Sequence, residues 1–115
     1  MQILAVNLAK ELVDAIVCEL GEVVCSAHNF EEASAQIQQE DFSIILYAVT
    51  EETFDRSILD ALVGLTLIST RIILLGENRQ LARYDGWQEL GIEFIHNPSL
   101  KSVICKIQGL SAHMP

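Results

Sequence analysis

The sequence predicts a doubly wound α/β sandwich of three layers, a (βα)5 chain around a central five-stranded parallel sheet. Two observations carry this prediction. Short apolar runs alternate with longer stretches whose apolar residues recur at helical spacing. The short runs are also continuously apolar, which is typical of strands that helices cover on both faces. Since crossovers between parallel strands are right-handed, such a chain places helices on both sides of one sheet.

The predicted strands are short apolar runs bounded by turn residues. They cover residues 3–6, 22–26, 42–49, 70–76 and 92–96. The run at 42–49 is uninterrupted except for Ser43 and is expected to be the central strand. Pro98 prevents the last strand from continuing, because proline lacks the backbone N–H that a ladder needs.

The predicted helices lie between the strands, at residues 9–20, 29–39, 50–64, 78–90 and 100–110. In the first and third, apolar residues three and four apart form the face that is expected to be buried. These stripes are Leu12, Val13, Ile16, Val17 and Leu20, and then Phe54, Ile58, Leu59, Leu62 and Val63. Gly21 is expected to end the first helix as a C-cap, and Asn29 to begin the second as an N-cap.

Length and composition indicate one domain. The chain has 115 residues, of which half are hydrophobic, so it can bury a core without disulfides or metals. We expect the domain to occupy residues 1–110 and residues 111–115 to form a C-terminal tail.

The formal net charge of −9 limits the class of partner. An acidic surface repels the phosphates of nucleic acid and of anionic membranes, so neither is an expected direct partner. A protein partner remains, and its contacting surface could be basic.

The three cysteines, Cys18, Cys25 and Cys105, favour a reducing compartment. Their number is odd, and Cys18 and Cys25 stand inside apolar runs, where a free thiol behaves as a small buried hydrophobe. The opening apolar run is too short for a signal peptide, and no run has the length of a membrane span. We therefore expect a cytoplasmic, soluble protein.

Chemistry in such a fold is expected beyond the carboxyl ends of the strands. No glycine-rich phosphate loop follows the first strand, and no serine or cysteine nucleophile stands at a strand-to-helix turn. Cys25 and His28 could share a metal, but a zinc site needs three or four ligands. His96 and the pair Glu51–Glu52 are the titratable groups near strand ends that an enzyme could use. The sequence predicts no enzyme, no metal and no cofactor.

Several segments give the chain a likeness to a known family. Residues 3–8, the Leu-Gly-Glu-Val-Val segment that begins at Leu20, the Glu-Glu-Ala segment at Glu31 and the stretch from Gly91 to Pro98 match its order of motifs. Over nearly the whole chain they resemble the receiver domains of bacterial response regulators. The resemblance implies a flavodoxin-like fold, and in typical members Mg²⁺ and phosphorylation of a strand aspartate by a histidine kinase.

The resemblance also implies where that chemistry would be. It needs an acidic pair for the metal, an aspartate acceptor, a hydroxyl and a lysine followed by proline. In that order the positions fall on Asn7 and Leu8, on Ala48 (or Tyr47 or Leu46 if the strand is shifted), on Gly76, and on Asn97 with Pro98. Pro98 matches, but the positions of the acidic pair, the acceptor, the hydroxyl and the lysine do not have the expected residue types, and residues 42–54 contain no aspartate. We interpret the chain as a pseudo-receiver with a degenerate phosphorylation pocket.

The remaining expectation concerns surfaces. In the family the fourth helix, fifth strand and fifth helix form the usual partner face, which here would draw on Leu81, Tyr84, Trp87, Ile95, Lys101, Val103, Ile104 and Ile107. We expect this face to mediate homodimerisation or docking to a signalling protein, without phosphorylation. Two alternative functions remain open. The chain is the N-terminal regulatory domain of a longer transcriptional regulator or kinase, or it is a small-ligand sensor that uses the degenerate phosphorylation pocket.

Overall fold

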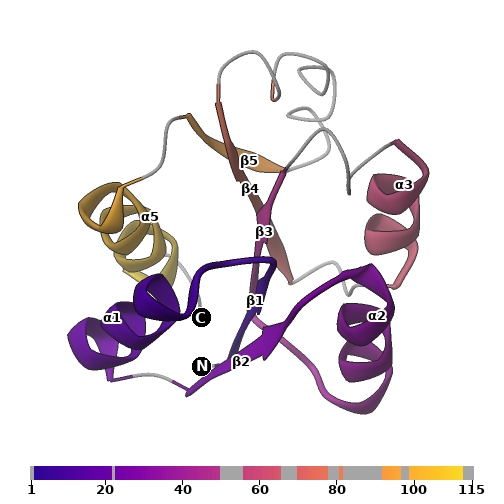
Figure 1. Ribbon diagram of the computed structural model, residues 1–115, viewed down its shortest axis with the longest axis horizontal. Coiled ribbons are helices and arrows are strands. Elements are labelled where there is room, and N and C mark those ends of the chain that lie inside the picture. The colour runs from indigo at the N-terminus through magenta and orange to yellow at the C-terminus, as the bar shows by residue number, and fades with distance from the viewer. Residues whose placement is uncertain are drawn as a thin grey trace.

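A computed structural model describes residues 2–21, 23–49, 56–65, 70–77, 81, 92–96 and 99–112 of the chain. In these residues strands and helices alternate from β1 to β4 as the sequence predicts, β5 is followed by a helix, and Figure 1 shows helices on both sides of a twisted sheet. The strands are β1 (Gln2–Val6), β2 (Val23–Ala27), β3 (Ile44–Ala48), β4 (Arg71–Gly76) and β5 (Glu93–His96). The helices are α1 (Lys10–Leu20), α2 (Phe30–Gln39), α3 (Arg56–Leu65) and α5 (Leu100–Ala112).

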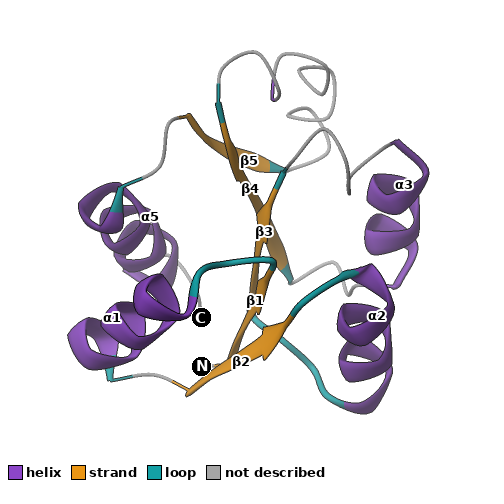
Figure 2. Cartoon of the chain, viewed as in Figure 1, coloured by secondary structure: helices purple, strands orange, loops and turns teal. Residues whose placement is uncertain are grey.

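The five strands form one parallel sheet in the order β2-β1-β3-β4-β5. The central position of β3 confirms the prediction for this run. Helices α1 and α5 cover one face of the sheet, and α2 and α3 cover the other (Figures 1 and 2). The predicted flavodoxin-like α/β class is therefore the observed one.

Burial on both faces explains why the strands are continuously apolar. Successive side chains of a strand point to opposite faces. In β3, Ile45 and Tyr47 belong to the buried cluster on the α2 and α3 side, while Ile44 and Leu46 belong to the cluster on the α1 and α5 side. All four are at most 1% exposed. Each of these four β3 residues thus supplies one of two cores, whereas the edge strands β2 and β5 keep exposed residues such as Val23, Ser26 and His96.

Two helix caps follow the sequence. Gly21 ends α1 at φ 64°, a left-handed conformation that glycine adopts without steric cost. The side chain of Asn29 accepts a hydrogen bond of 2.9 Å from the backbone N–H of Glu32, and the Glu32 carboxylate accepts one of 2.7 Å from the N–H of His28. These contacts satisfy backbone donors that a helix start leaves unpaired.

Some predictions about single side chains were wrong. Val17 and Val63, expected in buried stripes, are each 38% exposed. Each helix position turns the side chain by about 100°, so Val17 lies at the rim of the face that Val13 and Ile16 bury. Cys18 is exposed for the same reason, since it lies on the side of α1 opposite Ile16.

The C-terminal helix also differs from its prediction, because α5 continues to Ala112, past the expected end at residue 110. The predicted helix at 78–90, apart from residue 81, and Phe54 of the third stripe lie outside the described residues. Among the helices that the structure describes, none has the length and hydrophobicity needed to cross a bilayer.

Candidate functional site

The carboxyl edge of the sheet, where the degenerate pocket was predicted, is organised by Asn7. This residue directly follows β1 and has φ 60°, a region in which asparagine is among the few tolerated side chains. Its backbone N–H donates to the carbonyl of Ala27 at the end of β2, at 2.8 Å. Its side-chain Nδ2 donates a long hydrogen bond of 3.4 Å to the carbonyl of Ala48 at the end of β3. Asn7 therefore links the ends of three strands.

The other predicted pocket positions divide between this edge and the core. Ala48, the last residue of β3, is half-buried beside Asn7, and Gly76 ends the neighbouring strand β4. Leu8 turns away from the edge and packs against the core on the α1 and α5 side. Asn97 and Pro98 lie outside the described residues.

The described residues at this edge present few charged oxygen atoms. The residues that directly follow β1, β2, β3 and β4 are Asn7, His28, Val49 and Glu77. Val49 is buried, and its N–H donates to the carbonyl of Leu75 at 2.7 Å. Magnesium prefers several charged oxygen ligands, whereas these four residues include one carboxylate, on exposed Glu77.

The weaker metal and acid–base candidates stay separate. Cys25 is half-buried against the core on the α2 and α3 side, and His28 is exposed. In the part of the chain that the structure describes, no three histidine, cysteine or acidic residues are grouped closely enough to hold a metal. His96 is exposed at the end of β5, where its ring meets Phe94 edge to face, with 6.2 Å between the ring centroids. Glu51 and Glu52 lie outside the described residues.

Half of the predicted interaction face is core. Four of its eight residues are at most 7% exposed, namely Leu81, Ile95, Val103 and Ile107. Ile95 points from β5 towards α5, while Val103 and Ile107 lie one turn apart on the underside of that helix. Leu81 belongs to the core of the α2 and α3 side. These four cannot touch a partner, so this part of the prediction was wrong. Tyr84 and Trp87 lie outside the described residues.

The two remaining face residues line a groove that the sequence did not predict. Exposed Lys101 and half-buried Ile104, both on α5, border an open cavity of about 250 Å³. Its other lining residues are Leu100 and Cys105 of α5 and Glu19 of α1. No local sequence pattern predicts this groove, because Glu19 and the α5 residues come from opposite ends of the chain. The one signal in the sequence is apolar Leu100 beside charged Lys101 at the start of the last helix.

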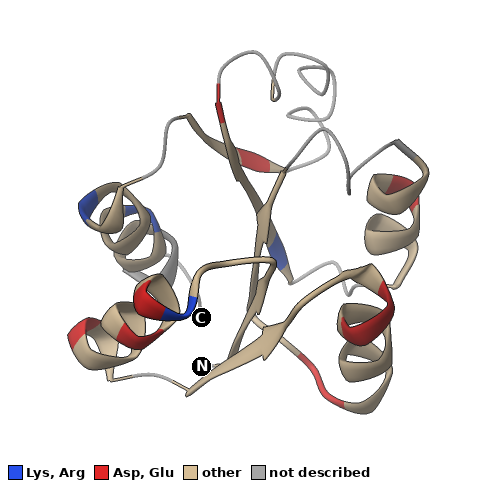
Figure 3. Cartoon of the chain, viewed as in Figure 1, with Lys and Arg blue, Asp and Glu red and all other residues tan. Residues whose placement is uncertain are grey.

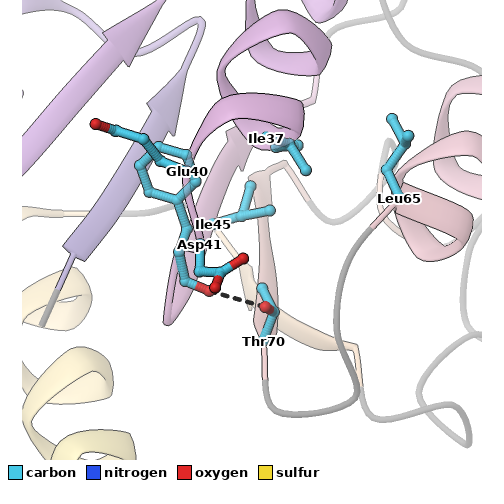
Figure 4. Close-up of a pocket in the computed structure, with 7 residues that line it drawn as sticks. Ile37, Glu40, Asp41, Ile45, Leu65 and Thr70 are labelled. Carbon is cyan, nitrogen blue, oxygen red and sulfur yellow. Dashed lines mark hydrogen bonds between the residues drawn. The ribbon is translucent and has the colours of Figure 1, made fainter.

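A second cavity lies at the amino edge of the sheet, far from the strand ends considered above. It is lined by Ile37, Glu40, Asp41, Phe42, Ile45, Leu65 and Thr70, and Figure 4 shows several of these side chains converging on it from α2, α3 and the starts of β3 and β4. The Thr70 hydroxyl donates to the carbonyl of Phe42 at 2.8 Å and fixes one wall. With about 50 Å³ this cavity has room for water but not for a metabolite.

Comparison with known proteins identifies the fold. No protein-family model and no curated protein sequence matches the chain. Solved structures do match it: the receiver domain of NtrC4 from Aquifex aeolicus (TM-score 0.78, 19% identity, covering 96% of each chain) and the chemotaxis response regulator CheY4 of Vibrio cholerae (TM-score 0.75, 18% identity, covering 95% of this chain and 97% of that one). An adenylate cyclase from Rhodopirellula baltica matches equally well (TM-score 0.78, 17% identity, covering 95% and 85%).

These similarities define the class of structure. The chain has the fold of response-regulator receiver domains, over nearly its full length. At identities below 20% the match concerns the fold alone, and the same fold hosts different functions. What this chain does must therefore be argued from its own residues.

Proposed function

We propose that this protein is a pseudo-receiver: a phosphorylation-independent interaction module that regulates signalling by binding a protein. The observation that carries the proposal is the state of the carboxyl edge of the sheet. By the resemblance, the acidic pair falls on Asn7 and Leu8 and the phosphoacceptor on Ala48 (or on Tyr47 or Leu46 if the strand is shifted), none of which is acidic. The Asn7 amide is hydrogen-bonded to the backbone of Ala48.

The chemistry of aspartyl phosphorylation supports this reading. The reaction needs a carboxylate oxygen as nucleophile and a cation that neutralises the incoming phosphoryl group. Alanine has no nucleophilic atom, and Leu8 packs into the core instead of facing the edge. The Asn7 amide is neutral, and its Nδ2 donates to the carbonyl of Ala48. Asn7 therefore supplies no carboxylate for a cation and contributes to holding the strand ends together.

Without phosphorylation chemistry at that edge, the exposed helices provide the surface for a binding function. Lys101 and Ile104 remain available beside the α1 and α5 groove. The net charge of −9 favours a protein over nucleic acid as the partner. Free thiols on Cys18 and Cys105 fit a cytoplasmic setting.

The proposal is tested by incubating the chain with acetyl phosphate and Mg²⁺ and measuring its intact mass. A phosphorylatable receiver domain in the same buffer serves as the positive control. We expect the control to gain one phosphoryl group and this chain to gain none. A phosphoryl group on this chain that hydroxylamine removes would be an acyl phosphate and would overturn the proposal.

A further inference from the structure

The groove between α1 and α5 carries an inference that rests on the proposed function and names its partner. The two helices are in contact on one face of the sheet (Figure 1). The groove takes Glu19 from the end of α1 and Leu100, Lys101, Ile104 and Cys105 from the first half of α5. Leu100 is 36% exposed, which leaves a large apolar side chain in contact with water.

The charges of the groove are available for contacts with another molecule. Glu19 and Lys101 are both exposed, and neither forms an ion pair or a side-chain hydrogen bond with another described residue. By contrast, Lys106 on the same helix is paired with Glu93 of β5. Figure 3 shows acidic residues along α1 and basic residues on α5. An unpaired carboxylate and an unpaired ammonium group therefore border an apolar floor.

We propose that a second copy of this chain binds the groove by two-fold symmetry. In such an interface every contact occurs twice, with the two residues exchanged between the protomers. Glu19 of one protomer faces Lys101 of the partner subunit, and Lys101 faces Glu19 of the partner subunit. Leu100, Ile104 and Cys105 pack against their equivalents between these two ion pairs.

The opposite charges within one groove favour a copy over a different occupant. A basic partner is attracted by Glu19 but repelled by Lys101, and an acidic partner experiences the reverse. A second copy supplies both charges in the required arrangement through symmetry alone. The net charge of −9 opposes association over longer distances, so the attraction must come from local pairs such as these.

The size of the groove sets the expected affinity. Stable complexes bury about 1,600 Å² in total, and a groove with five lining residues supplies only part of such an area. We therefore expect a reversible dimer with a dissociation constant in the range of micromolar or weaker.

Charge exchange tests the proposal, using the full chain and sedimentation equilibrium over a range of protein concentrations. The variants are Glu19→Lys, Lys101→Glu and the double variant with both changes. Each single variant should weaken the dimer about tenfold, because each reversal places like charges together twice per dimer. The double variant should restore the affinity, since it exchanges the two charges and keeps their complementarity.

Net charge alone predicts a different pattern, which makes the test specific. Glu19→Lys lowers the net negative charge and Lys101→Glu raises it, so a general repulsion effect would shift the two affinities in opposite directions. Glu31→Lys, an equal change on exposed α2 across the sheet, is the matched control and should leave the pairing intact. The proposal is overturned if the chain is monomeric throughout, or if the double variant is no tighter than the single variants.

Thiol cross-linking gives an independent readout. A chain with Cys105 as its only cysteine, after Cys18→Ser and Cys25→Ala, should form covalent dimers with a short bismaleimide, because Cys105 lines the groove. A chain with Cys18 alone is the control, since Cys18 is exposed but does not line the groove. Equal cross-linking of the two chains would contradict the proposed face.

Failure of this inference can be told from failure of the proposed function. A monomer that takes up no phosphoryl group refutes self-association and leaves a different protein as the partner. Uptake of a phosphoryl group refutes the proposed function, whatever the mass of the assembly.

Discussion

The carboxyl edge of the sheet and the groove between α1 and α5 use their polar groups in opposite ways. At the edge, Asn7 directs both its backbone and its side-chain donor to neighbouring strand ends. In the groove, Glu19 and Lys101 remain exposed beside apolar side chains. Polar groups that satisfy one another stabilise a fold, whereas exposed charges beside apolar surface are available to a partner. Under the proposed function, binding belongs to the helical face and the strand ends serve as structural support.

The largest expected effect concerns the support beneath the groove. Ile16 lies on the underside of α1 and is fully buried, so Ile16→Ala should lower the free energy of unfolding by about 3 kcal/mol. The neighbouring Val17→Ala variant is the control, and it should lose less than about 1 kcal/mol because Val17 is 38% exposed. Urea unfolding measures both. Equal losses would mean that α1 is rotated relative to the structure described above.

The second prediction concerns the edge. Asn7→Ala should lower the free energy of unfolding by about 1–2 kcal/mol, because alanine tolerates φ 60° poorly and lacks the side-chain donor. Asn7→Gly should recover most of this loss, since glycine adopts a positive φ freely. Thermal and urea unfolding compare the three proteins. If glycine is as destabilising as alanine, the side-chain bond to Ala48 matters more than the backbone conformation.

The smallest expected change in stability concerns Lys106, and it distinguishes this lysine from Lys101, the other lysine of α5. Lys106 is paired with Glu93, and both side chains are about one-third exposed, so Lys106→Ala should cost less than about 1 kcal/mol of stability, and less still at high salt. Because Lys106 does not line the groove, its loss should leave the dimer constant unchanged. A dimer weakened as much as by the Lys101→Glu change would show that association follows the total charge of α5 and not the groove.

Part of the edge could be predicted from the sequence, and the groove could not. Asn7 and Ala48 lie at strand ends, as the apolar runs indicate, and Asn29 is the expected N-cap, whereas Leu8, predicted beside Asn7 in the pocket, packs against the core. Which sides of two distant helices meet depends on tertiary packing. Ile16 and Val17 are adjacent on α1, yet Ile16 is buried and Val17 is exposed, because each residue turns the side chain by about 100°. For the same reason the sequence could not show that Glu19 and Lys101 line one groove.

The interaction face shows the same limit. The resemblance placed Val103 and Ile107 on a partner face, but apolar residues at helical spacing usually form the side of a helix that packs inward, as these two do. The two residues of that face that remain available, Lys101 and Ile104, lie at its border. A partner surface can be assigned from sequence only when it is known which apolar residues are buried in the core of the fold.

The most direct test of the central claim is the monomer–dimer constant measured by sedimentation equilibrium in two buffers, one of which contains acetyl phosphate and Mg²⁺. We expect the same constant in both buffers, with an intact mass that shows no phosphoryl group. A phosphoryl group on the chain together with a shifted constant would contradict it, because association would then follow phosphorylation.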